Sequence, residues 1–265
     1  DLLEASREYD AILIAASIEA TLPVLQSALE TKLPILVEKP VSYRSEELLP
    51  LIGHDLPVIV GYNRRFYRPV LEARNEARNG PPLIAHLTLP ERVSSPNQPS
   101  NHPCYLEPVF ANSVHGFDLA RFVLGELRII GAQRLANAGG ALTGVAALLT
   151  TDRGDVLQLT CNWQTPANFG LTLDRPGRRF ELKPFETSNV YEGMEITEPT
   201  SNQPIRSYKP RLVNKVGLED VDQHFKPGFF AQAQALGAMV RGEDPSPAAR
   251  IKDAHAALSL VEELV

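Results

Sequence analysis

The sequence has few cysteines and no paired-cysteine motif. Its 265 residues include only two, Cys104 and Cys161, which lie far apart in the chain. This low content excludes a small disulfide-stabilised scaffold and is typical of a reducing compartment, so we expect a cytoplasmic protein. The six histidines show no metal-ligand spacing and no cysteine accompanies them, so no metal site is predicted.

The sequence also lacks an excess of positive charge and long apolar runs. Lysine and arginine number 26 against 32 aspartates and glutamates, a formal net charge of −6. Nucleic-acid binding is therefore not expected, because it requires a basic surface. No apolar run reaches about 18 residues, so no membrane-spanning helix is predicted. At 43% hydrophobic and 22% charged residues, the composition is that of a globular protein with one large or two smaller domains.

Several motifs that define enzyme classes are missing. The chain contains no G-x-G-x-x-G turn, no phosphate-binding P-loop and no nucleophile-elbow serine. Its nearest glycine cluster, Gly139-Gly140 with Gly144, has a different spacing. The chain begins DLLEASREYDAILIAAS, without a methionine or a signal peptide, and we expect it to start in the middle of a fold.

The first 61 residues alternate between strand and helix patterns. Short continuous apolar runs predict buried strands at Ala11–Ala15, Ile35–Val37 and Pro57–Val60. Helical spacing predicts helices at Ile18–Thr31, with Ser17 available as the N-cap, and at Ser45–Ile52. Strands that alternate with helices in this way predict a parallel α/β sheet.

The pattern changes after residue 80. Residues 90–108 are rich in proline, serine and asparagine and are predicted to form a long irregular loop. A mostly antiparallel α+β domain is predicted, with a hairpin turn at Pro176-Gly177. Its expected strands are Leu83–Leu89, Ile129–Leu135, Ala146–Thr150, Val156–Trp163, Phe169–Asp174 and Arg178–Leu182. The expected helices are Pro69–Asn79, Val114–Leu124, Gly228–Arg241 and Ala248–Val265.

A first candidate site is Glu38-Lys39-Pro40, directly after a buried parallel strand. In open α/β sheets, ligands bind at this end of the strands. A partly buried lysine can donate or accept a proton, and a neighbouring glutamate can orient it. Pro40 fixes the backbone after the lysine and is a candidate for a cis peptide. The alternative is a solvated lysine beside a glutamate on a surface loop.

A second candidate is the segment Gly61–Tyr67, GYNRRFY, which follows the next strand. Arg64 and Arg65, with aromatic neighbours, could bind a carboxylate, a phosphate or sugar hydroxyls. Alternatively, Phe66 and Tyr67 pack at the domain junction while the arginines form surface ion pairs. We expect this second interpretation to hold for at least one of the two arginines.

A third candidate opens the helix predicted at Val114–Leu124. His115 and Asp118 are three residues apart and share one face of the helix, with Asn112 just before it. His115 falls in the first turn, where the positive end of the helix favours the neutral imidazole. A lone histidine on a helix is more often structural, and its position after a long polar loop raises the functional odds only modestly.

Taken in order, these segments resemble the glucose–fructose oxidoreductase / inositol dehydrogenase (Gfo/Idh/MocA) family. The segment YDAILIAASIEATLPVLQSALETKLPILVEKP is similar to the fourth and fifth strands of that family's dinucleotide fold and ends in its E-K-P signature. The segment GYNRRF is similar to the stretch after the sixth strand, and SVHGFDLARFVLGE to the family's histidine helix. FELKPFE and FKPGFFAQAQALGAMVRG resemble its large sheet and a late helix.

The resemblance implies two parts. Residues 1–66 would be the remainder of a Rossmann domain, strands 4 to 6, that binds NAD or NADP. Residues 67–265 would form a substrate-binding and oligomerisation domain with a large, mostly antiparallel open sheet, whose outer face in the family often forms an oligomer interface. The closing helix would pack back on the Rossmann part. A sugar, polyol or nucleotide-sugar substrate and a homo-oligomer are expected.

The resemblance also implies residue roles. Lys39 matches the lysine that relays a proton to or from the substrate hydroxyl, and His115 the histidine that contacts that hydroxyl and often acts as acid or base. For the cofactor, Ala16, Ser17, Glu38 and Lys39 match positions around the nicotinamide ribose. For the substrate, Arg65, Asn112 and Asp118 match positions in the pocket or its supporting shell.

Two departures from the family pattern qualify this expectation. Many family dehydrogenases have an aspartate four residues before the histidine, where this chain has Ala111, so a relay would rest on Lys39 and His115. This leaves room for a reductase or another variant chemistry. The first three strand–helix units of the fold, roughly 60–80 residues, are not in the chain, so we expect it to be inactive by itself. The function predicted is an NAD(P)-dependent oxidoreductase, and the alternative is a non-catalytic sugar-binding or oligomerisation module.

Overall fold

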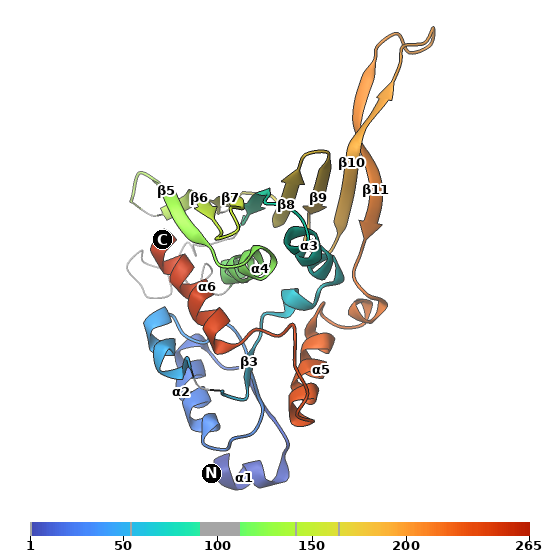
Figure 1. The fold of residues 1–265 in the computed structure, drawn as a ribbon. Coiled ribbons are helices and arrows are strands. Elements are labelled where there is room, and N and C mark those ends of the chain that lie inside the picture. Colours follow the sequence, from blue (N-terminus) through green and yellow to red (C-terminus); the bar gives the residue numbers. More distant parts are fainter. Residues whose placement is uncertain (1, 54, 91–111, 141, 164) are drawn as a thin grey trace.

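The computed structural model describes residues 2–53, 55–90, 112–140, 142–163 and 165–265. Within these ranges the chain forms a three-stranded and an eight-stranded sheet, with helices packed against both (Figure 1). Residues 91–108 of the predicted loop, which include Cys104, and Ala111 lie outside the described residues. The predicted fold class, a small parallel sheet followed by a large, mostly antiparallel one, is confirmed.

The small sheet is parallel, in the order β1-β2-β3. Its strands are β1 (Ile12–Ile14), β2 (Ile35–Val37) and β3 (Val58–Val60). β2 and β3 are fully buried, as their continuous apolar runs predict. The prediction that β1 is covered on both faces is wrong, because Leu13 is 63% exposed. On that face Leu36 and Ile59 pack against Ala235, and this cover does not extend over β1.

Two helical segments precede β1, and two more connect the three strands. They are α1 (Leu2–Ala5), η1 (Ser6–Glu8), α2 (Ile18–Leu29) and η2 (Ser45–Leu51). Ser17 stands at the N-cap position of α2, but its side chain makes no capping hydrogen bond, contrary to the prediction. The helix predicted at Ser45–Ile52 is a 3-10 segment rather than an α-helix. Pro50 lies inside it, and proline has no amide hydrogen to continue an α-helical ladder.

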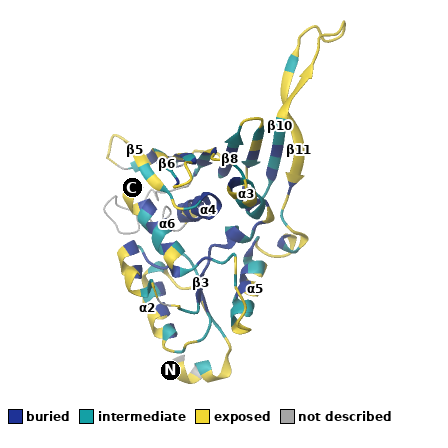
Figure 2. Cartoon of the chain, in the orientation of Figure 1, coloured by how far each residue is buried: buried dark blue, intermediate teal, exposed yellow. Residues whose placement is uncertain are grey.

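The large sheet has the strand order β11-β10-β9-β8-β4-β7-β6-β5. Its strands are β4 (Ile84–Thr88), β5 (Arg128–Ala136), β6 (Leu142–Thr150), β7 (Val156–Asn162), β8 (Gly170–Arg175), β9 (Arg178–Leu182), β10 (Ser188–Thr197) and β11 (Ser207–Val216). Only β4 and β7 pair in parallel, and the other neighbours are antiparallel. The β10–β11 hairpin extends away from the body of the molecule (Figure 1), and its outer part is exposed (Figure 2). Sequence analysis did not predict these last two strands.

The remaining helices lie against one side of the large sheet or beside the small sheet, and one of them links the two sheets (Figure 1). They are α3 (Arg68–Arg78), α4 (Val114–Leu124), α5 (Phe229–Val240) and α6 (Ile251–Leu264), with 3-10 segments η3 (Asn63–Phe66) and η6 (Asp220–Gln223). α6 begins three residues later than predicted because Asp253 Oδ2 accepts the Arg250 amide, 2.8 Å away, in a capping box. Within the described ranges, none of the helices is long and apolar enough to cross a bilayer.

α6 links the two sheets. Its Glu262 carboxylate accepts hydrogen bonds from the amide and the hydroxyl of Ser45, at 2.7 and 2.5 Å. Just before α6, Ala249 bridges to Val60 at the end of β3. α6 also packs against α4, and a single apolar cluster runs from β2 and β3 through α4 and α6 to the inner face of the large sheet. The junction between the two sheets is therefore a packed core, and it holds the ends of β2 and β3 against α4.

Candidate active site

The first part of the site is the carboxyl end of β2. Glu38 and Lys39 follow the strand, and the Lys39–Pro40 peptide is cis, in keeping with the sequence prediction for Pro40. The Glu38 amide donates to Ile14 O of β1 at 2.8 Å, so the ends of β1 and β2 lie side by side. A Cβ on Gly61, at the end of β3, would be 2.8 Å from Glu38 Oε2. Glycine at position 61 therefore lets the Glu38 carboxylate lie against the next strand end.

The two arginines of the η3 turn point to different partners. Arg65 is 5% exposed and forms a two-point ion pair with Asp118 of α4, with Nε–Oδ2 and Nη2–Oδ1 distances of 2.9 and 2.5 Å. Asp253 of α6 lies 3.3 Å from the same guanidinium. The predicted substrate-pocket residues Arg65 and Asp118 thus contact each other inside the protein, where they join η3, α4 and α6.

Arg64 packs against aromatic rings instead. Its guanidinium carbon lies 4.7 Å from the ring centroid of Phe169 and 5.4 Å from that of Phe185, and the guanidinium interacts with the Tyr67 hydroxyl. Its Nη1 atom is buried and has no hydrogen-bond partner among the described residues. Neither arginine forms the simple surface ion pair that the second interpretation of this segment expects for at least one of them.

His115 lies in the first turn of α4 and is 7% exposed. The ring of Tyr62 meets it edge-on, with centroids 5.7 Å apart. Its Nδ1 atom is buried without a hydrogen-bond partner in the described part of the chain. Burial lowers the pKa of His115 well below its usual value near 6.5, and the charges of Lys39, Arg64 and Lys226 lower it further. The ring is therefore neutral, as predicted, but burial rather than the helix end is the main cause.

Lys226 is a member of the site that sequence analysis missed. It precedes Pro227 and Gly228, which are held against the η3 turn because Asn63 Nδ2 donates to Pro227 O at 2.8 Å. Asp222 accepts the amide of Gly228, also at 2.8 Å. Gly228 has a φ of +76°, and a Cβ there would overlap Asn63 O. The lysine followed by a proline and a glycine is the local sequence feature that could have pointed to Lys226. Its position in the site depends, however, on Asn63, which is far away in the sequence.

The other predicted site residues lie near this group or at its margin. Ala16 and Ser17 are exposed at the end of β1, next to the strand end that carries Glu38 and Lys39. Asn112 lies two residues before α4 and is exposed. The structure thus brings together the strand ends, the η3 turn, the start of α4 and the loop before α5. This arrangement combines a neutral imidazole with three cations, which suits the stabilisation of negative charge on an oxygen atom.

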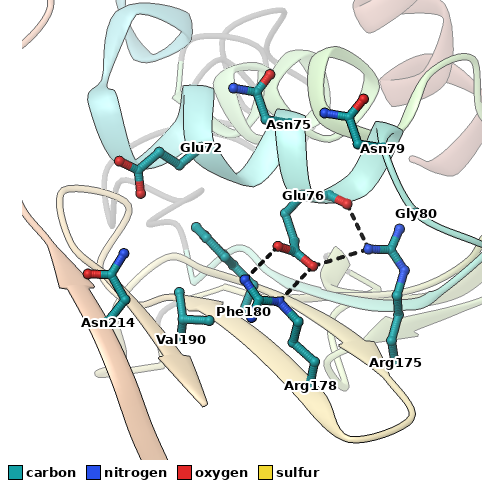
Figure 3. Close-up of a pocket in the computed structure, with 10 residues that line it drawn as sticks. All are labelled: Glu72, Asn75, Glu76, Asn79, Gly80, Arg175, Arg178, Phe180, Val190 and Asn214. Carbon is teal, nitrogen blue, oxygen red and sulfur yellow. Dashed lines mark hydrogen bonds and ion pairs between the residues drawn. The ribbon is translucent and has the colours of Figure 1, made fainter. Parts of the chain in front are cut away.

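A separate cavity of about 400 Å³ lies between α3 and the strands β8 to β11 (Figure 3). Neither Lys39 nor His115 lines it. Glu76 points from α3 toward Arg175 and Arg178, and its carboxylate forms ion pairs with them at 3.2 and 3.0 Å (Figure 3). Because the charged side chains of this cavity pair with one another, they are less available to bind a ligand than the residues at the strand ends.

The neutral state of His115 leads to a prediction for stability. The unfolded chain binds a proton at this residue below about pH 6.5, whereas the folded chain does so only at lower pH. The free energy of unfolding should therefore fall as the pH drops below about 6.5, with His115 contributing up to about 1.4 kcal/mol per pH unit. Urea unfolding across this range should give a shallower dependence for His115→Gln. His224→Gln, at an exposed position, should keep the wild-type slope. Equal slopes for all three proteins would contradict the assignment of a neutral His115.

Comparisons with known proteins agree with this architecture. The chain is 29% identical over 133 residues to inositol 2-dehydrogenase 4 of Saccharopolyspora erythraea, a match that covers 47% of this chain and 38% of that protein. The crystal structure of a dehydrogenase (MviM) from Clostridium difficile matches with a TM-score of 0.73 at 15% identity. The match covers 99% of this chain and 80% of the MviM chain. The structure of an Agrobacterium radiobacter oxidoreductase in complex with NAD+, L-tartaric acid and magnesium matches with a TM-score of 0.68 at 15% identity. That match covers 99% of this chain and 79% of the oxidoreductase chain. No family model matches the chain.

These structural likenesses show the fold of the chain, a small parallel sheet followed by a large, mostly antiparallel one. The resemblance to the glucose–fructose oxidoreductase / inositol dehydrogenase family is confirmed on this basis. The matched segment spans little more than a third of the length of the curated inositol dehydrogenase.

Proposed function

We propose that this protein is an NAD(P)-dependent oxidoreductase that transfers a hydride between nicotinamide and a hydroxyl or carbonyl carbon of a sugar, polyol or nucleotide-sugar. The observation that carries the proposal is that Lys39, at the carboxyl end of a parallel strand, is close enough for its charge to act on a buried, neutral His115. That edge is where open α/β sheets bind ligands. The names of the relatives support this chemistry, because they include an inositol 2-dehydrogenase and an oxidoreductase solved with NAD+.

The residues at the strand ends fit the nicotinamide side of such a cofactor. Ala16 and Ser17 are small and exposed, which leaves room for a flat ring and a ribose beside Glu38 and Lys39. Glu38 can accept hydrogen bonds from ribose hydroxyls, and its position against Gly61 holds the carboxylate in place. When bound, the nicotinamide would accept or supply the hydride. The 265 residues contain no G-x-G-x-x-G turn, so we assign no residue of this chain to the pyrophosphate.

Lys39 and His115 would handle the proton of the reacting hydroxyl. The neutral imidazole can accept a hydrogen bond from this hydroxyl, and the ammonium group of Lys39 stabilises negative charge that develops on the oxygen. Burial and the surrounding cations disfavour an imidazolium, so His115 would pass the proton on rather than keep it. Arg65 and Asp118 would act as positioning residues, because their ion pair fixes α4 one turn beyond His115. Asn112, exposed before α4, remains a proposed substrate contact.

The test is hydride transfer by the protein joined to the upstream strand–helix units that the family resemblance leads us to expect. The completed protein is mixed with NAD or NADP and a panel of sugars, polyols and nucleotide-sugars, and nicotinamide absorbance is followed. With a responsive substrate, Lys39→Met should lower kcat by about 10²-fold or more, which is the scale of general acid–base catalysis. Arg44→Gln, an exposed residue that pairs with Glu46, is the matched control and should keep full turnover. Full turnover by Lys39→Met would remove the lysine from the mechanism. No turnover with any substrate would favour the alternative, a non-catalytic sugar-binding or oligomerisation module.

We also propose that the protein forms a homo-oligomer through the outer face of the large sheet. Ile130 and Leu148 are 61% and 39% exposed on the neighbouring strands β5 and β6, where they line a shallow, mostly apolar depression. Exposed apolar surface that spans neighbouring strands is typical of a protein interface. The exposed residues Met194 and Ile196 of β10 extend this apolar character to the far end of the sheet.

A further inference from the structure

Arg64 is held in place by contacts that leave part of its guanidinium without a partner. Its stacking on Phe169 and Phe185 supports the plane of the group through cation–π contacts. No carboxylate lies within 4.0 Å of it among the described residues, and Nη1 is buried without a hydrogen bond. A guanidinium presented in this way offers its N–H edge to a carboxylate or phosphate, the groups whose geometry it matches best.

Lys226 is brought to the same place from the other end of the chain. Pro227 and Gly228 are fixed to the η3 turn by the hydrogen bond from Asn63 and by the close approach of Gly228 to Asn63 O. The ammonium group of Lys226 lies 4.7 Å from the ring centroid of Phe229, and it forms no ion pair within the described ranges. Two like charges are thus fixed on neighbouring segments, and both are supported by aromatic rings.

The acids that the structure describes in this region do not pair with these cations. Asp222 accepts the Gly228 amide, the Glu38 carboxylate lies against Gly61, and the charge of Glu186 acts on Tyr67. The charges of Arg64 and Lys226 both reach His115, together with that of Lys39. The surroundings of the imidazole therefore carry an excess of positive charge, which costs free energy through repulsion unless an anion balances it.

We propose that the substrate of this site carries a negatively charged group, a carboxylate or a phosphate, which binds between Arg64 and Lys226 next to the hydroxyl that faces His115. The proposal rests on the proposed function, because it names the substrate class of the same site. An acidic sugar or a sugar phosphate meets this description, and a neutral hexose or polyol does not. The anion would supply the balancing charge and fix the distance of the reacting carbon from His115.

The test is calorimetric binding of three ligands that share one sugar ring, namely glucose, glucuronate and glucose 1-phosphate, to the purified protein without nicotinamide. At least one of the charged ligands should bind about tenfold or more tightly than glucose. Comparing glucuronate with glucose 1-phosphate distinguishes a site for a carboxylate from a site for a phosphate. Arg64→Gln and Lys226→Gln should each weaken binding of that charged ligand about tenfold more than they weaken binding of glucose.

Arg68→Gln is the matched control. Arg68 follows the same turn but is exposed and pairs with Glu72 and Glu219, at 3.4 and 3.7 Å, so its replacement should not alter binding. Circular dichroism would verify that the variants fold. Equal binding of all three ligands, no measurable binding of any, or an equal loss in Arg68→Gln would overturn the proposal. Tight anion binding without hydride transfer would refute the proposed oxidoreductase alone, whereas turnover of neutral polyols without preference for anions would refute this inference alone.

Discussion

Replacing Asp118 by asparagine should lower the free energy of unfolding by about 3 kcal/mol, because it leaves Arg65 charged and buried without its main partner. Asp118 is 1% exposed and binds the guanidinium at two points. We expect the lower end of the usual range for breaking a buried ion pair, because Asp253 stays 3.3 Å from Arg65. Urea unfolding followed by circular dichroism would measure the change, with the slope m checking that both proteins unfold alike.

An exposed ion pair provides the comparison. Glu198 and Arg206 are 61% and 50% exposed and lie in the outer part of the β10–β11 hairpin, so Glu198→Gln should cost less than about 1 kcal/mol. The double replacement Arg65→Met with Asp118→Leu should recover much of the stability lost in Asp118→Asn, because it removes both buried charges. If Asp118→Asn costs no more than Glu198→Gln, the pair does not hold η3 against α4.

Gly228→Ala should destabilise the protein by about 2–5 kcal/mol, for two reasons that add. The positive φ of +76° costs an alanine about 1–2 kcal/mol of conformational free energy. Its Cβ would also overlap the backbone oxygen of Asn63, and overpacking of this kind costs about 1–3 kcal/mol. Thermal and urea unfolding would measure the loss. Because the clash is with backbone, the 226–228 segment should also move away from the η3 turn and weaken anion binding.

Gly177 separates the two effects. It has the same φ of +76° in the β8–β9 turn, but nothing lies within 4 Å of the Cβ position. Gly177→Ala should therefore show only the conformational cost, about 1–2 kcal/mol. Equal losses in the two variants would mean that the contact between Gly228 and Asn63 contributes little, and that Lys226 is held by other interactions.

The parallel strands β2 and β3 were predictable because burial on both faces leaves a continuous apolar run in the sequence. β2 agrees at both ends, and β3 differs by one residue at its start. The last two strands of the large sheet were not predictable on the same basis. The outer half of β10 and most of β11 are exposed, and only the first residues of β10 alternate toward a core. The pairing of the hairpin, rather than burial, defines these strands.

The site divides in a similar way. Lys39 and His115 were predictable from local motifs, one after a buried strand and the other at the start of a helix. The partners of the two adjacent arginines were not, because they depend on which elements pack around the η3 turn. Arg65 meets Asp118 only when α4 is in place, and Lys226 reaches the site only through the contact of Asn63 with Pro227. Contacts between residues so distant in sequence leave no periodic signal.

The single parallel pairing in the large sheet has a consequence for the order of folding. β4 is a central strand, and Ile84 pairs with Val156 on one side and Asp174 on the other. Both partners lie far along the chain, so neither pairing can form until most of the domain has been synthesised, and such distant contacts form slowly. α4, with His115, lies within the connection between β4 and β7. We therefore expect His115, the proposed acid–base residue, to reach its final position late, when the two halves of the sheet close on β4.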